Sequence, residues 1–206
     1  MEGKRHVDPA SGTQCVRCGK QVIPLGCHKG ILAHWGVVGM PFEPKNPQFE
    51  TTVRRSFAQQ GLMVSLGATM TRVSPGSVEI EIRSRDDLTQ QHGYLHGGIV
   101  TAIADSACGY AALTLMPSGA EVLTVEYKVN FLAPAQGLRL VARGRVVRPG
   151  RTVSVCSGEV VAVSDGNEVP VAAMLATMIR FDKRLPGRPD AGTNHDPSTR
   201  AGGRSP

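Results

Sequence analysis

The stretch from Gly97 to Leu115 restricts the fold of this chain more than any other part of it. Its apolar residues recur with the period of a helix, at positions 99, 100, 103, 104, 107, 108, 111, 112 and 115. A helix that is apolar over so much of its surface is stable only when other elements enclose it. The sequence therefore predicts a buried central helix around which the rest of the domain is built.

A single acidic residue, Asp105, interrupts this apolar run. It shares a helix face with Thr101 and Gly109, because residues four apart lie one above the other. A buried carboxylate without a partner is costly, and such a residue is seldom kept inside a protein unless it is paired or has a task. Asp105 is therefore a candidate functional residue.

The central helix opens with His96-Gly97-Gly98. The first N–H groups of a helix have no acceptor within it and carry the positive end of its dipole, and glycine lets another molecule approach the backbone closely. Gly97 or Gly98 is therefore a candidate donor to an anionic or polarised group. The alternative is that the two glycines only allow a tight turn into the helix.

Six strand-like segments surround the central helix. They span residues 64–73 and 77–83 before it, and residues 121–132, 138–147, 152–163 and 169–181 after it. Residues 47–66 have the spacing of a short amphipathic helix that is broken near Gly61. The short turns between the last four strands predict an antiparallel meander. The predicted fold class is α+β, with an antiparallel sheet wrapped around one long helix.

The positive charge of the chain is confined to its ends. The net charge is +6, but residues 1–39 and 183–206 each carry five basic and two acidic residues, whereas residues 40–182 carry thirteen of each. A neutral central part argues against nucleic acid as a partner. We predict a domain over residues 40–182. Residues 1–39 are expected to be a disordered extension or to precede a true start at Met40, and residues 183–206 a disordered tail.

The five cysteines fall into two groups. Cys108 and Cys156 lie in apolar periodic segments, which is typical of small core residues in a reducing cytoplasm. Cys15, Cys18 and Cys27, with His28 or His34, could supply the four ligands of a structural zinc ion, although the usual two-plus-two spacing is missing. Neither a signal peptide nor an apolar run long enough for a membrane span is present, so we expect a cytoplasmic protein.

Residues 47–182 resemble hotdog-fold acyl-CoA thioesterases of the PaaI-like, phenylacetate-pathway group. The resemblance rests on three motifs in order. The first motif is His96-Gly97-Gly98, with Asp105 nine residues after the histidine. Residues 125–135 read VEYKVNFLAPA, and residues 148–152 read RPGRT.

This resemblance implies hydrolysis of a thioester by a dimer or tetramer, without a metal or an organic cofactor. It implies that the Gly97 amide donates to the thioester carbonyl, that Asp105 is the catalytic carboxylate, and that the Thr124 hydroxyl helps to place the attacking water. Members of this type often carry Asn six residues before the motif histidine, where this chain has Gln90.

Other residues near these motifs have two interpretations each. We expect His96 to hold the loop by hydrogen bonding rather than to act as a base, because Asp105 already fills that role. Gly98 is expected beside the substrate. Arg148 and Arg151 flank a hairpin turn and are either solvated or, as the resemblance implies, ligands of the phosphates of coenzyme A.

A distance argument predicts the quaternary structure. Gly97 and Asp105 are eight residues apart, which is about 12 Å along one helix. The Gly97 amide and the Asp105 carboxylate must each lie about 3 Å from the reacting group or its water. One chain therefore cannot supply both groups to one carbonyl. If two helices pack antiparallel across a two-fold axis, each site combines Gly97 of one chain with Asp105 of the other. We therefore predict a homodimer, with a tetramer left open.

The sequence leaves several points open. Asp105 is either a general base or a nucleophile, and the acyl group is either aromatic or a medium or long alkyl chain. Two other functions compete with acyl-CoA hydrolysis. One is a hotdog hydratase or dehydratase, which relies on a histidine, and the other is a non-catalytic module that binds acyl-CoA.

Overall fold

The structure of the chain is a computed structural model that describes residues 5–7, 14–18, 21–24 and 42–182. The chain divides into two compact units, Met1–Met40 and Pro41–Pro206. The first unit holds three short strands, β1 (Arg5–Val7), β2 (Gln14–Cys18) and β3 (Gln21–Pro24), which form an antiparallel sheet. These strands were not predicted from the sequence. The candidate zinc ligands Cys27, His28 and His34 lie outside the described residues, as does the predicted tail 183–206.

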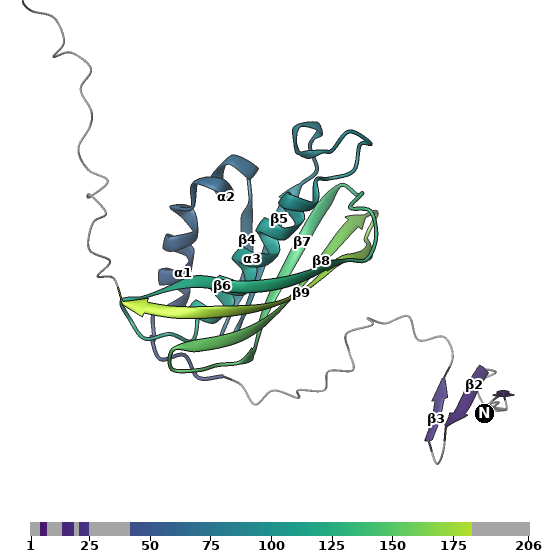
Figure 1. Cartoon of the computed structure of the whole chain (residues 1–206), viewed down its shortest axis with the longest axis horizontal. Helices are drawn as coiled ribbons and strands as arrows, with labels where there is room; N and C mark the ends of the chain where they lie inside the picture. Colours follow the sequence, from purple (N-terminus) through teal and green to yellow (C-terminus); the bar gives the residue numbers. More distant parts are fainter. Residues whose placement is uncertain (1–4, 8–13, 19–20, 25–41, 183–206) are drawn as a thin grey trace, which may run out of the picture. The chain divides into compact units, whose positions relative to one another are not determined.

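The second unit has one six-stranded antiparallel sheet and one long helix, as Figure 1 shows. Its elements in order are α1 (Phe49–Ala58), α2 (Gly61–Leu66), β4 (Thr69–Ser74), β5 (Ser77–Arg83), the short 3-10 helix η1 (Asp86–Leu88), α3 (Gly97–Leu113), β6 (Ala120–Phe131), β7 (Arg139–Arg148), β8 (Val153–Ser164) and β9 (Asn167–Asp182). The strands lie in the order β4-β5-β7-β8-β9-β6. This arrangement confirms the predicted α+β hotdog fold.

Two details of the prediction are wrong. Residues 64–66 belong to α2, and the first strand of this sheet begins only at Thr69. In addition, only β7, β8 and β9 form a meander, because β6 pairs with β9 instead of β7. The reason is that α3 carries the chain across the sheet, so that β6 joins it at the opposite edge from β4.

The close approach of α3 to the sheet depends on small residues on both sides. A Cβ atom on Gly144 of β7 would lie 2.2 Å from the backbone carbonyl of Ala107 in α3. A Cβ atom on Gly158 of β8 would lie 2.9 Å from the Cys108 sulfur. The middle of α3 is accordingly buried, with Ile103 and Ala107 fully enclosed. The sheet therefore holds the helix, and with it Asp105, in a fixed position.

The two core cysteines belong to this contact. Cys108 and Cys156 are both fully buried and are not joined in a disulfide. Burial raises the pKa of Cys156 to about 12. Burial, followed by the neighbouring Cys156 and Asp105, raises the pKa of Cys108 well above its usual value. Because the thiolate is the nucleophilic form, neither side chain is a candidate for covalent catalysis.

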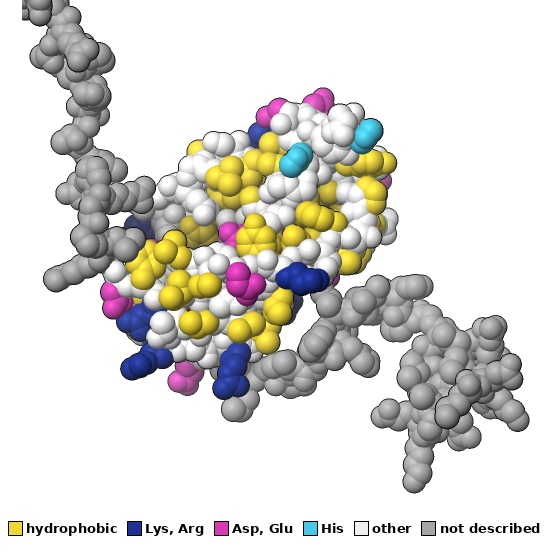
Figure 2. Space-filling model, viewed as in Figure 1, with side chains coloured by type: hydrophobic (Ala, Val, Ile, Leu, Met, Phe, Trp, Pro, Cys, Tyr) yellow, Lys and Arg dark blue, Asp and Glu magenta, His cyan; other side chains and the backbone are white. Residues whose placement is uncertain are grey.

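The outer elements leave one long edge of the sheet uncovered. The α1 helix packs on α3, where the Phe57 ring meets Tyr110 edge-on at 5.7 Å between centroids. At the sheet edge, β6 has an exposed set of large apolar side chains, comprising Leu123, Val125, Tyr127 and Phe131. Figure 2 shows hydrophobic side chains gathered on the face along which β6 runs. No helix among residues 42–182 or in the described parts before them is long and apolar enough to cross a membrane.

The contact between α3 and the sheet is testable by one added methyl group. We expect Gly144→Ala to lower the free energy of unfolding by about 3 kcal/mol, because the new Cβ would overlap the helix backbone, which cannot move without displacing α3. Gly61→Ala is the matched control, since its Cβ would meet no atom within 4 Å and should change stability by only about 0.5 kcal/mol. Urea unfolding at one fixed protein concentration measures both. Equal stability of the two variants would contradict the close contact.

Candidate active site

The start of α3 has one backbone donor without an acceptor. His96 is the N-cap residue, and its Nδ1 accepts the Gly98 N–H at 2.9 Å. The N–H groups of Ile99 and Val100 donate to the carbonyl of His96 at 2.9 and 3.3 Å. Within the part of the chain that the structure describes, the N–H of Gly97 has no acceptor. This N–H is thus left free at the positive end of the helix dipole.

The Phe131 ring lies against the same glycine. A Cβ atom on Gly97 would lie 3.0 Å from Cζ of Phe131, which is 56% exposed in the single chain. Sequence reasoning missed this residue as part of the site. The available signal was its alternation with Tyr127 and Val129, which places all three on the same face of β6. A group bound at the Gly97 N–H would be in contact with this ring.

The loop before α3 is held by its own hydrogen bonds. The carboxamide oxygen of Gln90 accepts the His92 N–H at 2.7 Å, and the backbone N–H of Gln90 donates to Tyr94 at 2.8 Å. The N–H of Leu95 donates to Ala135 at 3.0 Å, which ties the loop to the segment after β6. In this structure Gln90 shapes the loop, and its side chain makes no hydrogen bond to Asp105.

The acidic residue of α3 has a hydroxyl partner on β6. Thr124 donates to Oδ1 of Asp105 at 2.7 Å, and the Asp105 side chain is only partly exposed. The Thr124 oxygen also lies 3.5 Å from the Met178 sulfur, but its one proton favours the shorter and charged partner. No donor to Oδ2 of Asp105 is found among the described residues. This oxygen can therefore accept a proton or a hydrogen bond from a bound molecule.

The structure thus groups the candidate residues into two candidate half-sites in one chain. His96, Gly97 and Phe131 lie at the start of α3, and Asp105 and Thr124 lie at its middle. The eight residues between Gly97 and Asp105 correspond to about 12 Å of straight helix, so one chain does not bring the two groups together. The helix is continuous between these two residues, as the distance argument from the sequence assumes.

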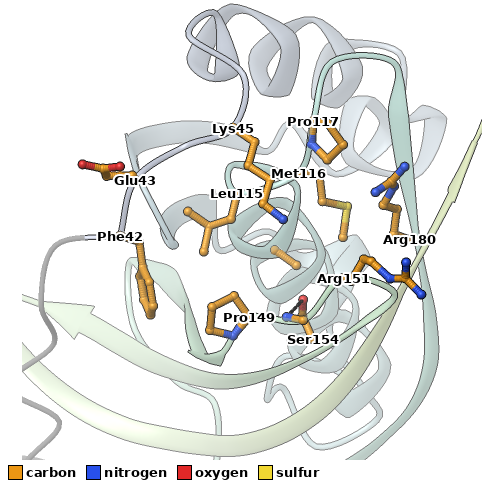
Figure 3. Close-up of a pocket in the computed structure, with 12 residues that line it drawn as sticks. Phe42, Glu43, Lys45, Leu115, Met116, Pro117, Pro149, Arg151, Ser154 and Arg180 are labelled. Atoms are coloured by element: carbon orange, nitrogen blue, oxygen red, sulfur yellow. Dashed lines mark hydrogen bonds between the residues drawn. The ribbon is translucent and has the colours of Figure 1, made fainter.

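The two arginines of the β7–β8 turn lie elsewhere. Arg151 lines a cavity beyond the other end of α3, shown in Figure 3, whereas Arg148 is exposed at the end of β7. Neither residue forms an ion pair with any residue that the structure describes. The cavity does not include Gly97 or Asp105.

Comparison with known proteins identifies the family of this chain. A family model described as the thioesterase superfamily matches residues 92–169, which include both half-sites. The crystal structure of a thioesterase family protein from Silicibacter pomeroyi is 49% identical and has a TM-score of 0.64, covering 65% of this chain and 98% of that one.

Two further relatives connect the chain to the predicted group. A phenylacetic acid degradation-related protein from Ralstonia eutropha is 28% identical with a TM-score of 0.55, covering 64% of this chain and 98% of that one. Human acyl-coenzyme A thioesterase 13 is 28% identical over 90 residues, which are 43% of this chain and 64% of the human protein. The resemblance to PaaI-like proteins is confirmed. The chain belongs to the thioesterase superfamily and is a thioester hydrolase.

Proposed function

We propose that this protein hydrolyses acyl-CoA thioesters, with an aryl or a medium to long alkyl acyl group, to the free acid and coenzyme A. The observation that carries the proposal is the free N–H of Gly97 at the start of the helix that also holds Asp105. The name of the human relative supports coenzyme A as the carrier of the acyl group.

The start of α3 suits the oxygen of the thioester carbonyl. Attack on the carbonyl carbon moves negative charge onto this oxygen in the transition state. A free N–H at a helix start is already oriented toward such a charge, and the helix dipole adds to its effect. Because the neighbouring N–H groups of Gly98, Ile99 and Val100 are engaged, Gly97 is the donor that a substrate can reach.

The middle of α3 suits the attacking water. The proton of Thr124 is directed to Asp105, so the Thr124 oxygen can accept a hydrogen bond from a water molecule while Oδ2 of Asp105 accepts another. The water oxygen then forms a bond to the carbonyl carbon as its proton moves to Asp105. Cleavage of the carbon–sulfur bond releases the thiol, which takes up a proton. Direct attack by Asp105, through a mixed anhydride that water then opens, remains the alternative route.

The complete site requires two copies of the chain. The 12-residue strand β6 is an uncovered edge, with unpaired backbone groups and exposed apolar side chains such as Tyr127 and Phe131. Such an edge favours pairing with another strand. Antiparallel pairing of β6 with its copy across a two-fold axis would set the two α3 helices antiparallel. Gly97 of one protomer would then face Asp105 of its partner, and each dimer would have two sites.

The capping geometry of His96 weighs against a hydratase or dehydratase. Because Nδ1 of His96 accepts the Gly98 N–H, the proton of the neutral imidazole is on Nε2. In this state neither nitrogen is free to act as a base. The half-exposed Phe131 ring and the small side chains of α3 are compatible with either class of acyl group.

Release of free thiol from a panel of aryl- and alkyl-CoA thioesters tests the proposal directly. We expect the wild type to hydrolyse at least one class, and Asp105→Asn to lower kcat by about 100-fold or more, because the amide cannot accept the proton of water. Thermal unfolding of both proteins is the control for folding. An Asp105→Asn variant that binds acyl-CoA and keeps full activity would exclude the assigned role. A wild type that binds without releasing thiol would identify a binding module.

The role of the Gly97 N–H is testable with two substitutions at the same position. Gly97→Pro removes the N–H at the first position of α3, where proline is tolerated. His96 before it is extended, at φ −63° and ψ 136°, as a residue before proline must be. We expect kcat to fall by roughly 100-fold.

Gly97→Ala is the control for this change. It adds a side-chain carbon close to the Phe131 ring but keeps the N–H. Its activity should stay within about tenfold of the wild type, since the exposed ring has only to move by a few tenths of an ångström. Equal losses of kcat in the two variants would show that activity needs the space that glycine leaves at this position and not its N–H.

A further inference from the structure

The helix pair α1 and α2 is fastened to α3 directly beside the candidate acid. The hydroxyl of Ser106 donates to Oε1 of Gln60 at 3.2 Å, and Ser106 is buried. Ser106 follows Asp105 in the sequence, whereas Gln60 lies at the corner between α1 and α2. This corner is therefore a neighbour of the candidate site, and the catalytic steps proposed above give it no role.

The α2 helix continues from this corner toward the start of α3. Phe57 of α1 meets Tyr110 of α3. Three residues later, Gln60 meets Ser106, which lies four residues nearer the start of α3. The two helices therefore run antiparallel, and the chain beyond Gln60 follows α3 toward its first residue. Figure 1 shows α1 and α2 on one side of α3.

The far end of α2 is tied to the segment that leads into α3. The guanidinium of Arg85 donates to the carbonyls of Ser65 and Leu66, each at 3.3 Å. Three residues after Arg85, the carbonyl of Leu88 accepts the N–H of His96, the N-cap residue of α3, at 2.9 Å. The α2 helix is thus held at both ends, between the middle and the start of α3.

The two flanks of α2 face in different directions. Met63 and Leu66 are buried and mark the side of α2 that faces the core. Val64, which is 65% exposed, lines a cavity together with Met70 of β4. Leu62 is 53% exposed and lies about 100° before Met63 around the helix, just as Val64 lies about 100° after it. Val64 therefore faces β4, and Leu62 lies on the opposite flank.

The flank that carries Leu62 is the one toward the exposed side of α3. β4 is the outer strand of the sheet, and α3 packs over β5, β7 and β8. Ala102 lies between Asp105 and Ser106 around α3, one turn nearer the helix start, because residues three and four apart share a face. Ala102 is only partly buried. A path from Asp105 to Leu62 therefore crosses an apolar methyl group.

This arrangement suits an extended apolar acyl chain. A chain attached to a carbonyl at Asp105 that extends toward α2 would lie over Ala102 and cover Leu62. The gain from such a contact grows with each carbon that leaves water. We propose that Leu62 of the protomer that supplies Asp105 determines specificity for a medium or long alkyl chain, and that Gln60 positions α2 for this contact. The proposal rests on the proposed function.

A series of straight-chain thioesters from butanoyl-CoA to dodecanoyl-CoA tests the role of Leu62. The measured quantity is the ratio of kcat/KM for dodecanoyl-CoA to kcat/KM for butanoyl-CoA. We expect Leu62→Ala to lower this ratio by about five- to tenfold, because a chain that ends before α2 gains nothing from the leucine. A ratio within about twofold of the wild type would overturn the proposal.

Val64→Ala is the matched control. Val64 belongs to the same short helix and is more exposed than Leu62, but it faces β4. Its substitution should leave the ratio within about twofold of the wild type. Equal effects of the two substitutions would contradict a contact on one flank of α2. A loss of kcat/KM for every chain length in Leu62→Ala, together with weaker dimerisation in sedimentation, would place Leu62 under a second copy of the chain and overturn the proposal.

The positioning role of Gln60 is tested by two further variants. Gln60→Leu removes the acceptor of the Ser106 hydroxyl, whereas Gln60→Glu keeps a side-chain oxygen at the same place. We expect Gln60→Leu to lower the same ratio by about threefold, and Gln60→Glu to keep it near the wild-type value. A fall in melting temperature and in kcat/KM for every chain length, with an unchanged ratio, would show that Gln60 only stabilises the fold.

A binding measurement separates this proposal from the catalytic one. If the wild type releases no thiol from any aryl- or alkyl-CoA thioester, the proposed function fails. Leu62 is judged independently with the thioethers S-dodecyl-CoA and S-butyl-CoA, which cannot be hydrolysed. Tighter binding of S-dodecyl-CoA in calorimetry, lost in Leu62→Ala but kept in Val64→Ala, supports an acyl site at α2. Equal affinities of the wild type and Leu62→Ala for S-dodecyl-CoA would overturn it.

Discussion

The packing of α3 against the sheet is the constraint on which the rest of this structure depends. Gly144 and Gly158 let the helix backbone approach β7 and β8 so closely that an added methyl group on either would meet atoms of α3. The helix cannot slide or bend without losing this contact. Its start and its middle therefore hold Gly97 and Asp105 at a separation of about 12 Å, and the chain cannot close this distance by itself.

Because one chain cannot bring Gly97 and Asp105 together, its surface presents groups that a second chain could pair or cover. The β6 edge is unpaired, Tyr127 and Phe131 are half exposed, and one oxygen of Asp105 has no partner among the described residues. A second copy of the chain would pair the edge, cover the aromatic rings and bring a free N–H to the acid.

Much of the fold followed from local patterns in the sequence, because helix periodicity and strand alternation are local properties. The central helix, Asp105 within it and the glycines at its start were all predicted. The pairing of β6 with β9 was not, since nothing in either strand specifies its neighbour. Residues 64–66 were assigned to both a helix and a strand, because a short apolar run fits either, and the structure places them in α2. The approach of Phe131 to Gly97 joins two segments that are distant in the sequence, and only the folded structure reveals it.

Subunit mixing tests the composite site most directly. Gly97→Pro and Asp105→Asn protomers with different affinity tags can be combined, and the heterodimer purified through both tags. If each site takes its donor from one chain and its acid from the other, the heterodimer has one intact site and one doubly altered site. Its kcat per dimer is then predicted to be about half that of the wild type, although each parent homodimer is nearly inactive. A heterodimer as inactive as its parents would contradict the account.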